Sequence, residues 1–295
     1  MSTSSHPAAP RRGSTSSAAR RRIVHEQALA AKRQRQRRAA LVSIGLVIAL
    51  FAALIIGKAA TNHRTATQAS TVTSAAATAN VVTRATTVPA GVYAAIGTGG
   101  TTAQAQPVPG GTATTVGGKP EILYLGAEYC PYCAAQRWPL VIALSRFGTF
   151  TGLGLTESSS TDVYPSTNTF TFLHATYTSP YLAFTSVELY DRDNQPLQTA
   201  TAAQQQLLQN AGGGGIPFID LGGTTMLRSS GYTPQLLANL TWTQIADALT
   251  DTGNPATQAI IGTANRITAR LCTLTHDQPA PVCQTPTVRA LESAS

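Results

Sequence analysis

Hydrophobic and polar residues are distributed unevenly along this chain. Residues 39–57 form an uncharged apolar run, and a helix of these nineteen residues would extend about 28 Å, close to the thickness of a bilayer's hydrocarbon core. The sequence therefore predicts a single N-terminal transmembrane helix. A cleaved signal peptide is the alternative, but residues 1–38 make a long leader and the apolar run exceeds the usual length in such peptides.

The pattern changes again after residue 57. Residues 58–116 are rich in Thr, Ala, Ser and Gly, which predicts an extracytoplasmic linker, and only residues 88–97 suggest a short strand or a docking segment. Residues 117–295 mix strand-like and helix-like stretches, which predicts one α/β domain. Its expected strands lie near residues 122–126, 169–177, 181–190, 218–220 and 224–228, and its expected helices follow Cys133 as far as Ser145 and cover residues 197–210, 234–250 and 255–271.

The net charge of +8 would suggest nucleic-acid binding if the charges were spread evenly. Residues 1–38, however, carry ten Lys and Arg against one Glu, whereas the chain from residue 58 onward carries eleven basic and twelve acidic residues. We therefore expect no nucleic-acid partner. Because basic residues mark the cytoplasmic side of a membrane helix, residues 1–38 are predicted to be a disordered cytoplasmic tail of a single-pass cell-membrane protein, with the C-terminal domain outside.

Cys130 and Cys133 stand where a predicted strand passes into a predicted helix. A thiol at a helix N-terminus faces unpaired N–H groups and the positive end of the helix dipole, and both favour the reactive thiolate. Cys133 follows one turn later, where it can resolve a mixed disulfide, so we expect both cysteines to be catalytic. A structural disulfide and half of a zinc site are the alternatives, although the five histidines make no ligand pattern with the cysteines.

The other two cysteines, Cys272 and Cys283, are separated by a Pro-rich turn after the last predicted helix. In an oxidising compartment, a disulfide across so short a loop would contribute roughly 3 kcal/mol and hold the C-terminus in place. A structural disulfide is the main expectation. A second redox pair that relays electrons is the alternative.

Two motifs resemble those of the thioredoxin superfamily. The segment Ala127-Glu-Tyr-Cys-Pro-Tyr-Cys133 is similar to the superfamily's Ala-Glu-aromatic-Cys-X-X-Cys, and Ile216-Pro217 before a strand is similar to its cis-proline signature. The resemblance implies a thioredoxin-like fold, a mixed central sheet flanked by helices, in which the proline loop lies against the cysteine pair. It also implies substrate binding by Ile216, Pro217, Pro131 and Tyr132. We expect no cofactor and no metal.

A wider set of residues resembles an uncharacterised family of membrane-anchored bacterial and archaeal proteins, domain-of-unknown-function family 929. The similar segments are the basic tail, residues 137–140 and 145–148, and the spacing of Cys272 and Cys283. This resemblance implies no particular activity.

Two positions depart from the thioredoxin pattern. Tyr124 stands where the superfamily carries a buried acid, and Tyr132 supplies no positive charge beside the thiolate. We therefore expect a reduction potential between about −270 mV, the thioredoxin value, and about −120 mV, that of a strongly oxidising relative. We also expect Glu128 to be exposed, and Arg137 to contact a substrate or to pair with Glu128.

Together these features predict a membrane-anchored, extracytoplasmic thiol–disulfide oxidoreductase. Its expected substrates are exported proteins that contain cysteines. Its expected redox partner is membrane-bound, either a quinone-linked disulfide generator or a reductant carrier, and the direction of electron flow stays open. The alternative is a non-catalytic thioredoxin-fold binding module or holdase of the cell envelope, with structural disulfides.

Overall fold

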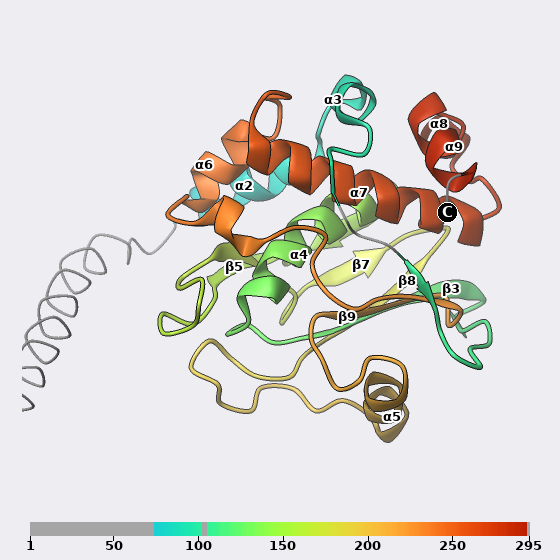
Figure 1. Cartoon of the computed structure of the whole chain (residues 1–295), viewed down its shortest axis with the longest axis horizontal. Coiled ribbons are helices and arrows are strands. Elements are labelled where there is room, and N and C mark those ends of the chain that lie inside the picture. The colour runs from blue at the N-terminus through green and yellow to red at the C-terminus, as the bar shows by residue number, and fades with distance from the viewer. Residues whose placement is uncertain (1–73, 102–104, 294–295) are drawn as a thin grey trace, which may run out of the picture. The chain divides into compact units, whose positions relative to one another are not determined.

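The computed structural model describes residues 74–101 and 105–293 (Figure 1). The predicted cytoplasmic tail, the predicted transmembrane helix over residues 39–57 and the first part of the predicted linker lie outside these residues. Within the described part of the chain, no helix is both long enough and apolar enough to span a bilayer. The described residues belong to one compact unit.

A mixed sheet forms the centre of this unit. Its middle strand, β3 (Lys119–Gly126), runs parallel to β8 (Ala183–Glu188) and antiparallel to β9 (Phe218–Leu221). β9 pairs with β10 (Thr225–Leu227), β10 pairs with β1 (Gln106–Pro107), and β2 (Thr115–Val116) pairs with the first residues of β3. Residues 122–126 are all buried, and a strand covered on both faces is expected to be a continuous apolar run.

Helices cover both faces of the sheet, which confirms the predicted α/β class with a mixed sheet flanked by helices. α4 (Pro131–Leu144) and α7 (Pro255–Leu274) lie on one face, and α5 (Ala202–Asn210) lies on the other (Figure 1). A 3₁₀ turn, η1 (Pro234–Leu237), and α6 (Trp242–Ala248) lead from the sheet to α7. Side-chain caps explain where helices begin, since Asn254 accepts hydrogen bonds from two N–H groups of α7 and Thr201 opens α5 with a capping box.

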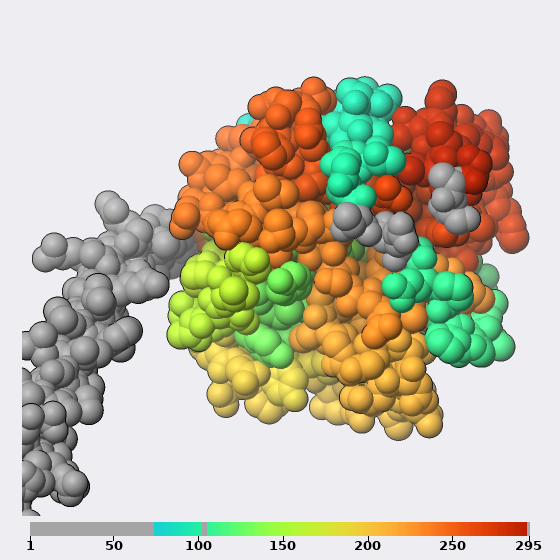
Figure 2. Space-filling model, in the orientation of Figure 1, coloured from blue at the N-terminus to red at the C-terminus, as the bar shows by residue number. Residues whose placement is uncertain are grey.

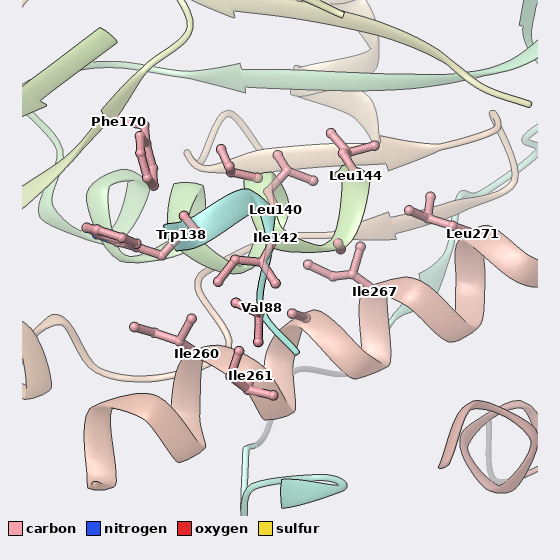
Figure 3. Packing of buried hydrophobic residues seen from close by; sticks show 14 of the residues in the cluster. Val88, Trp138, Leu140, Ile142, Leu144, Phe170, Ile260, Ile261, Ile267 and Leu271 are labelled. Atoms are coloured by element: carbon pink, nitrogen blue, oxygen red, sulfur yellow. The ribbon is translucent and has the colours of Figure 1, made fainter. Parts of the chain in front are cut away.

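The main core lies between α4 and α7 (Figure 3). Every residue of α4 except Tyr132 is buried, and a helix enclosed on all sides is expected to be apolar all round. The helix continues through Pro139. A smaller cluster on the other face joins Leu123 and Phe218 to Leu208 of α5. The side chains labelled in Figure 3 are Val88, Trp138, Leu140, Ile142, Leu144, Phe170, Ile260, Ile261, Ile267 and Leu271.

Two separate two-stranded sheets fill the sequence between α4 and β8. β4 (Thr149–Thr151) pairs with β7 (Thr176–Thr178), and β5 (Gly154–Glu157) pairs with β6 (Asn168–Thr171). The single strand predicted over residues 169–177 is therefore divided into two. A turn closed by a 3.0 Å hydrogen bond from the Ala175 N–H to the Phe172 carbonyl oxygen separates β6 from β7.

The linker predicted over residues 58–116 is wrong for its described part: β1 and β2 place residues 106–107 and 115–116 in the sheet, and residues 75–97 form two helices, α2 (Ala75–Thr86) and α3 (Ala90–Ile96). Residues 88–97 therefore do not form a short strand, and the alternative prediction of a docking segment is confirmed, because Val88, Val92 and Tyr93 pack into the main core. In Figure 2 the α3 segment lies against the C-terminal helices. The buried side chains that this segment adds to the main core are Val81, Ala85, Val88, Val92 and Tyr93.

Close contact with α7 explains why few large side chains suffice in this segment. The side-chain amide of Asn265 donates hydrogen bonds to the carbonyl oxygens of Tyr93, at 2.9 Å, and Gly97, at 2.8 Å. The backbone of Thr98 occupies the space where a side chain on Gly262 would lie. Small residues let two backbones approach closely, and an amino-acid composition typical of linkers conceals this kind of packing.

The C-terminal helices are tied to α7. α8 (Ala280–Cys283) and α9 (Pro286–Ser293) follow it, and a disulfide joins Cys272 in α7 to Cys283 in α8. Their Cα atoms lie 5.4 Å apart. The bridge closes the short Pro-rich turn in which the sequence predicted it, and Val288 of α9 is buried against the same core.

Candidate active site

Cys130 and Cys133 lie at the turn from β3 into α4, as predicted from the sequence. Cys130 is the N-cap residue of α4, and its sulfur accepts a 3.3 Å hydrogen bond from the backbone N–H of Cys133. Pro131 occupies the first turn, where a missing N–H leaves no helical hydrogen bond unmade. Both thiols are held between two fixed elements: the buried end of β3 precedes them, and α4 begins at the Cys130 cap.

The two thiols differ in environment. Both are free thiols in the structure; the Cys130 residue is 6% exposed and Cys133 is fully buried. Hydrogen bonds from the side chain and the backbone N–H of Cys133, with the charge of Arg137, lower the pKa of Cys130 against the opposing effect of burial. Burial raises the pKa of Cys133 well above its ordinary value. Cys130 is therefore the more readily ionised thiol of the pair.

The Ile216–Pro217 loop lies directly against the cysteine pair. The peptide bond between these residues is cis. The carbonyl oxygen of Ile216 accepts a hydrogen bond from the Cys130 thiol, with 3.9 Å between sulfur and oxygen. The pairing of β9 with β3 brings the loop here, since β9 begins at Phe218, opposite Leu125 near the end of β3. The structure thus brings together the two motifs on which the thioredoxin resemblance depends.

Two tyrosines of the cysteine motif pack against tyrosines from other parts of the chain. Tyr132 is 37% exposed and packs edge-on against Tyr164, with ring centres 5.9 Å apart. Tyr129, one residue before Cys130, packs against Tyr190 with ring centres 6.1 Å apart. Sequence reasoning named Tyr132 but missed Tyr164 and Tyr190, because both come from loops that follow other strands and carry no recognisable motif.

Glu128 and Arg137 differ from their predicted roles. Glu128 is buried, not exposed, and accepts hydrogen bonds from the hydroxyls of Thr171 and Thr156. Arg137 is also buried, and it pairs with Glu188 rather than with Glu128 or a substrate. The reason is that α4 packs along the sheet, so that Arg137 lies beside the end of β8, where Glu188 is located.

Tyr124, at the position of the superfamily's buried acid, lies in the same buried layer. Burial raises the pKa of its hydroxyl well above 10, so Tyr124 stays neutral. The guanidinium carbon of Arg137 lies 5.7 Å from the centre of the Tyr124 ring. Among the described residues, the Tyr124 hydroxyl has no hydrogen-bond partner. No group of three or more His, Cys, Asp or Glu side chains within the described ranges could hold a metal ion.

The fold and site define a mixed α/β domain with a Cys-X-X-Cys pair at a strand-to-helix turn. Residues 110–212 match the model of a family described as "Domain of unknown function (DUF929)". The match confirms the sequence-based resemblance to this family over those residues, which include β3, α4 and both free cysteines. No curated protein and no solved structure matches the chain.

Proposed function

We propose that this protein is a thiol–disulfide oxidoreductase that acts through Cys130 and Cys133. The observation that carries the proposal is the difference between two thiols that lie one helical turn apart. Cys130 caps a helix and has a lowered pKa, whereas Cys133 is fully buried behind it. A structural cysteine pair has no need of this difference, but exchange chemistry requires one thiol that attacks and one that resolves.

In the reductive direction, the Cys130 thiolate attacks one sulfur of a substrate disulfide. A bond forms between Cys130 and that sulfur, and the other substrate sulfur leaves as a thiolate. Cys133 then loses its proton and attacks the Cys130 sulfur, which forms the Cys130–Cys133 disulfide and releases the second substrate thiolate. Two electrons pass to the substrate, and the same steps in reverse oxidise a substrate dithiol.

The order of the elements supports a thioredoxin-like fold for the domain. β3, α4 and β8 form a parallel strand–helix–strand unit that carries Cys-X-X-Cys at its first turn, and β9 and β10 add an antiparallel hairpin on the opposite edge of β3. A Cys-X-X-Cys beside such a unit is typical of thioredoxin-like redox proteins. The contact of Cys130 with Ile216 supports substrate binding by Ile216, Pro217, Pro131 and Tyr132.

The proposed location is the outer side of a cell membrane, with residues 39–57 as the anchor and the N-terminus in the cytoplasm. The Cys272–Cys283 disulfide supports this location, because such bonds persist mainly outside the cytoplasm. Exported proteins with cysteines are the proposed substrates. A quinone-linked disulfide generator or a membrane-bound reductant carrier is the proposed electron partner.

Trapping of mixed disulfides in cells tests the proposal. Cys133→Ser leaves Cys130 able to attack but unable to be released, so we expect adducts with exported proteins that disappear on reduction. Cys130→Ser, the matched control, should form none. If neither variant forms adducts and neither changes thiol turnover, the protein is instead a binding module whose exposed tyrosines hold polypeptides without exchange. The redox state of the wild-type pair in cells then gives direction, since a mostly oxidised pair indicates a disulfide donor.

A further inference from the structure

We propose that Arg137 is the countercharge that stabilises the Cys133 thiolate during exchange, and that Glu188 is the residue that positions it. The inference builds on the proposed function of the cysteine pair. It assigns a role to a fully buried charge that sequence reasoning expected to contact a substrate or to pair with Glu128. Three observations support it, namely the position of Arg137 on α4, the way it is held, and a hydrogen-bond donor that it leaves unused.

Arg137 follows Cys133 by four residues on α4. Side chains four residues apart lie on the same face of a helix, one turn from each other, so the guanidinium and the Cys133 sulfur share one side of α4. Both residues are fully buried. In this low-dielectric layer a charge acts on its neighbours more strongly than it would at the surface.

Three hydrogen bonds hold the Arg137 side chain. Its Nε and Nη2 atoms donate to the two carboxylate oxygens of Glu188, at 3.0 and 2.7 Å, and Nη2 also donates to the carbonyl oxygen of Ala127 at 2.9 Å. Such a two-point pairing fixes the orientation of the guanidinium plane. Ala127 lies at the start of the turn that leads to Cys130, so the arginine is anchored to the backbone of the cysteine loop itself.

One donor of this arginine is unused. Its Nη1 atom is buried without a hydrogen-bond partner among the residues that the structure describes. A buried unpaired donor is unfavourable, and in native proteins it calls for a specific explanation. A thiolate that forms only during the reaction provides one, because the donor would gain its acceptor at the step where negative charge appears.

Among the described residues, Arg137 is the single positive charge that can stabilise a Cys133 thiolate. Burial and the neighbouring Cys130 raise the pKa of Cys133, and the charge of Arg137 opposes them. Tyr124 of β3 stays neutral, and Glu188 of β8 carries a negative charge that is bound to Arg137. Within the described part of the chain, Arg137 is the only cation among the main causes that shift the pKa of either thiol.

The countercharge serves exchange in both directions. When Cys133 resolves a mixed disulfide, its proton passes to the departing substrate thiolate or to water, and the Cys133 thiolate then attacks Cys130. When a substrate thiolate attacks Cys130 of the oxidised pair, the Cys130–Cys133 bond breaks and Cys133 is the leaving group. The same buried anion forms in each case, so one buried cation lowers both barriers.

Ellman's reagent separates the two steps in the full-length chain in detergent. Attack by Cys130 releases one thionitrobenzoate at a rate proportional to reagent concentration. Attack by Cys133 on the mixed disulfide releases the second at a rate independent of that concentration. We expect Arg137→Met to slow the second step at least tenfold at pH 7 and to move its pH midpoint upward. Arg137→Lys should stay within about threefold of wild type, and Tyr124→Phe within about twofold.

Glu188→Gln supplies the decisive comparison. It weakens the same ion pair but keeps the positive charge of Arg137, so the pH midpoint of the second step should move down. Arg137→Met should move that midpoint up. If the ion pair is merely structural, the pH midpoint of the second step should move in the same direction in both variants, and that result overturns the proposal. An unchanged second step in folded Arg137→Met also overturns it. If Arg137→Met does not fold, Glu188→Gln decides alone, because it keeps the buried positive charge: a midpoint of the second step that stays unchanged or moves up overturns the proposal. If the wild-type protein releases thionitrobenzoate in neither step, that result instead contradicts the proposed function.

Discussion

The sulfur of Cys130 lies 3.9 Å from the carbonyl oxygen of Ile216, although 86 positions separate the two residues in the sequence. β9 runs antiparallel to β3, and this pairing delivers the loop before β9 to the end of the strand that leads into Cys130. Under the proposed function, the backbone of Ile216 would lie beside a substrate bound at the Cys130 thiol. On that proposal, an extended polypeptide would meet both the Cys130 sulfur and a main-chain carbonyl group to pair with.

The reactivity of Cys130 should depend on the Cys133 side chain. A hydrogen bond from that side chain is the largest cause that lowers the Cys130 pKa, so wild-type Cys130 should react with iodoacetamide with a pH midpoint below that of an unperturbed cysteine thiol. Cys133→Ala removes the donor and should raise the midpoint, whereas Cys133→Ser keeps a donor and should raise it less. Mass spectrometry at a series of pH values gives the profiles. Equal midpoints in the two variants would exclude the side-chain hydrogen bond as the cause.

The disulfide between Cys272 and Cys283 should stabilise the fold without taking part in exchange. The bridge spans 11 positions, and closing so short a loop is worth about 3 kcal/mol. Cys272→Ala/Cys283→Ala should therefore lower the melting temperature by roughly 6–12 °C, and thiol turnover by the remaining pair should be unchanged. A relay predicts the reverse, namely lost turnover with a small change in melting temperature.

The features that sequence reasoning predicted well are local ones. The position of Cys130 at a helix start follows from a buried apolar run, a Cys-X-X-Cys and a proline in the first helical turn. The distinction between the free cysteines Cys130 and Cys133 and the Cys272–Cys283 disulfide follows from the spacing of the cysteines and the Pro-rich turn between the last two. These signals lie within a few residues of each other, so they can be recognised without knowledge of the tertiary structure.

The features that it missed depend on distant contacts or small residues. The partner of Arg137 is Glu188, 51 positions away, and only the parallel pairing of β3 with β8 places that carboxylate beside α4. Glu128 is near in sequence, but threonines from β5 and β6 bind it. Residues 75–97 were predicted to be a linker because their side chains are small, yet small side chains such as Val81 and Ala85 are buried in the core.

Asp220 should make the stability of the domain depend on pH. Burial, the larger cause, raises its pKa from 3.8 to about 6, and the charge of Glu121 adds to the rise. The folded chain therefore holds this proton more tightly than the unfolded chain, so the contribution of Asp220 to stability falls as the pH rises from 3.8 to 6, by up to about 3 kcal/mol.

The variant Asp220→Asn isolates this contribution. Its side-chain oxygen still accepts the hydrogen bond from the N–H of Gly223, which lies 3.1 Å from the aspartate oxygen. We expect Asp220→Asn to match the wild type near pH 4 and to be more stable by about 1–3 kcal/mol at pH 8, measured by urea unfolding. A constant difference between the two proteins across this range would show that the carboxyl does not titrate as described.

The contact between α7 and the segment after α3 gives the last prediction. A side chain on Gly262 would collide with the backbone of Thr98, whereas a side chain on Gly91 of α3 would meet no atom within 4 Å. Gly262→Ala should therefore force residues 98–99 away from α7, destabilise the domain by about 1–3 kcal/mol and expose the segment to protease. Gly91→Ala changes the same residue type in a helix with open space around it, and it should be neutral or stabilise by about 0.5–1 kcal/mol. Thermal unfolding and limited proteolysis measure both effects. If residues 75–101 were a loose linker, the two substitutions would be equally tolerated, because neither glycine would then face a fixed backbone.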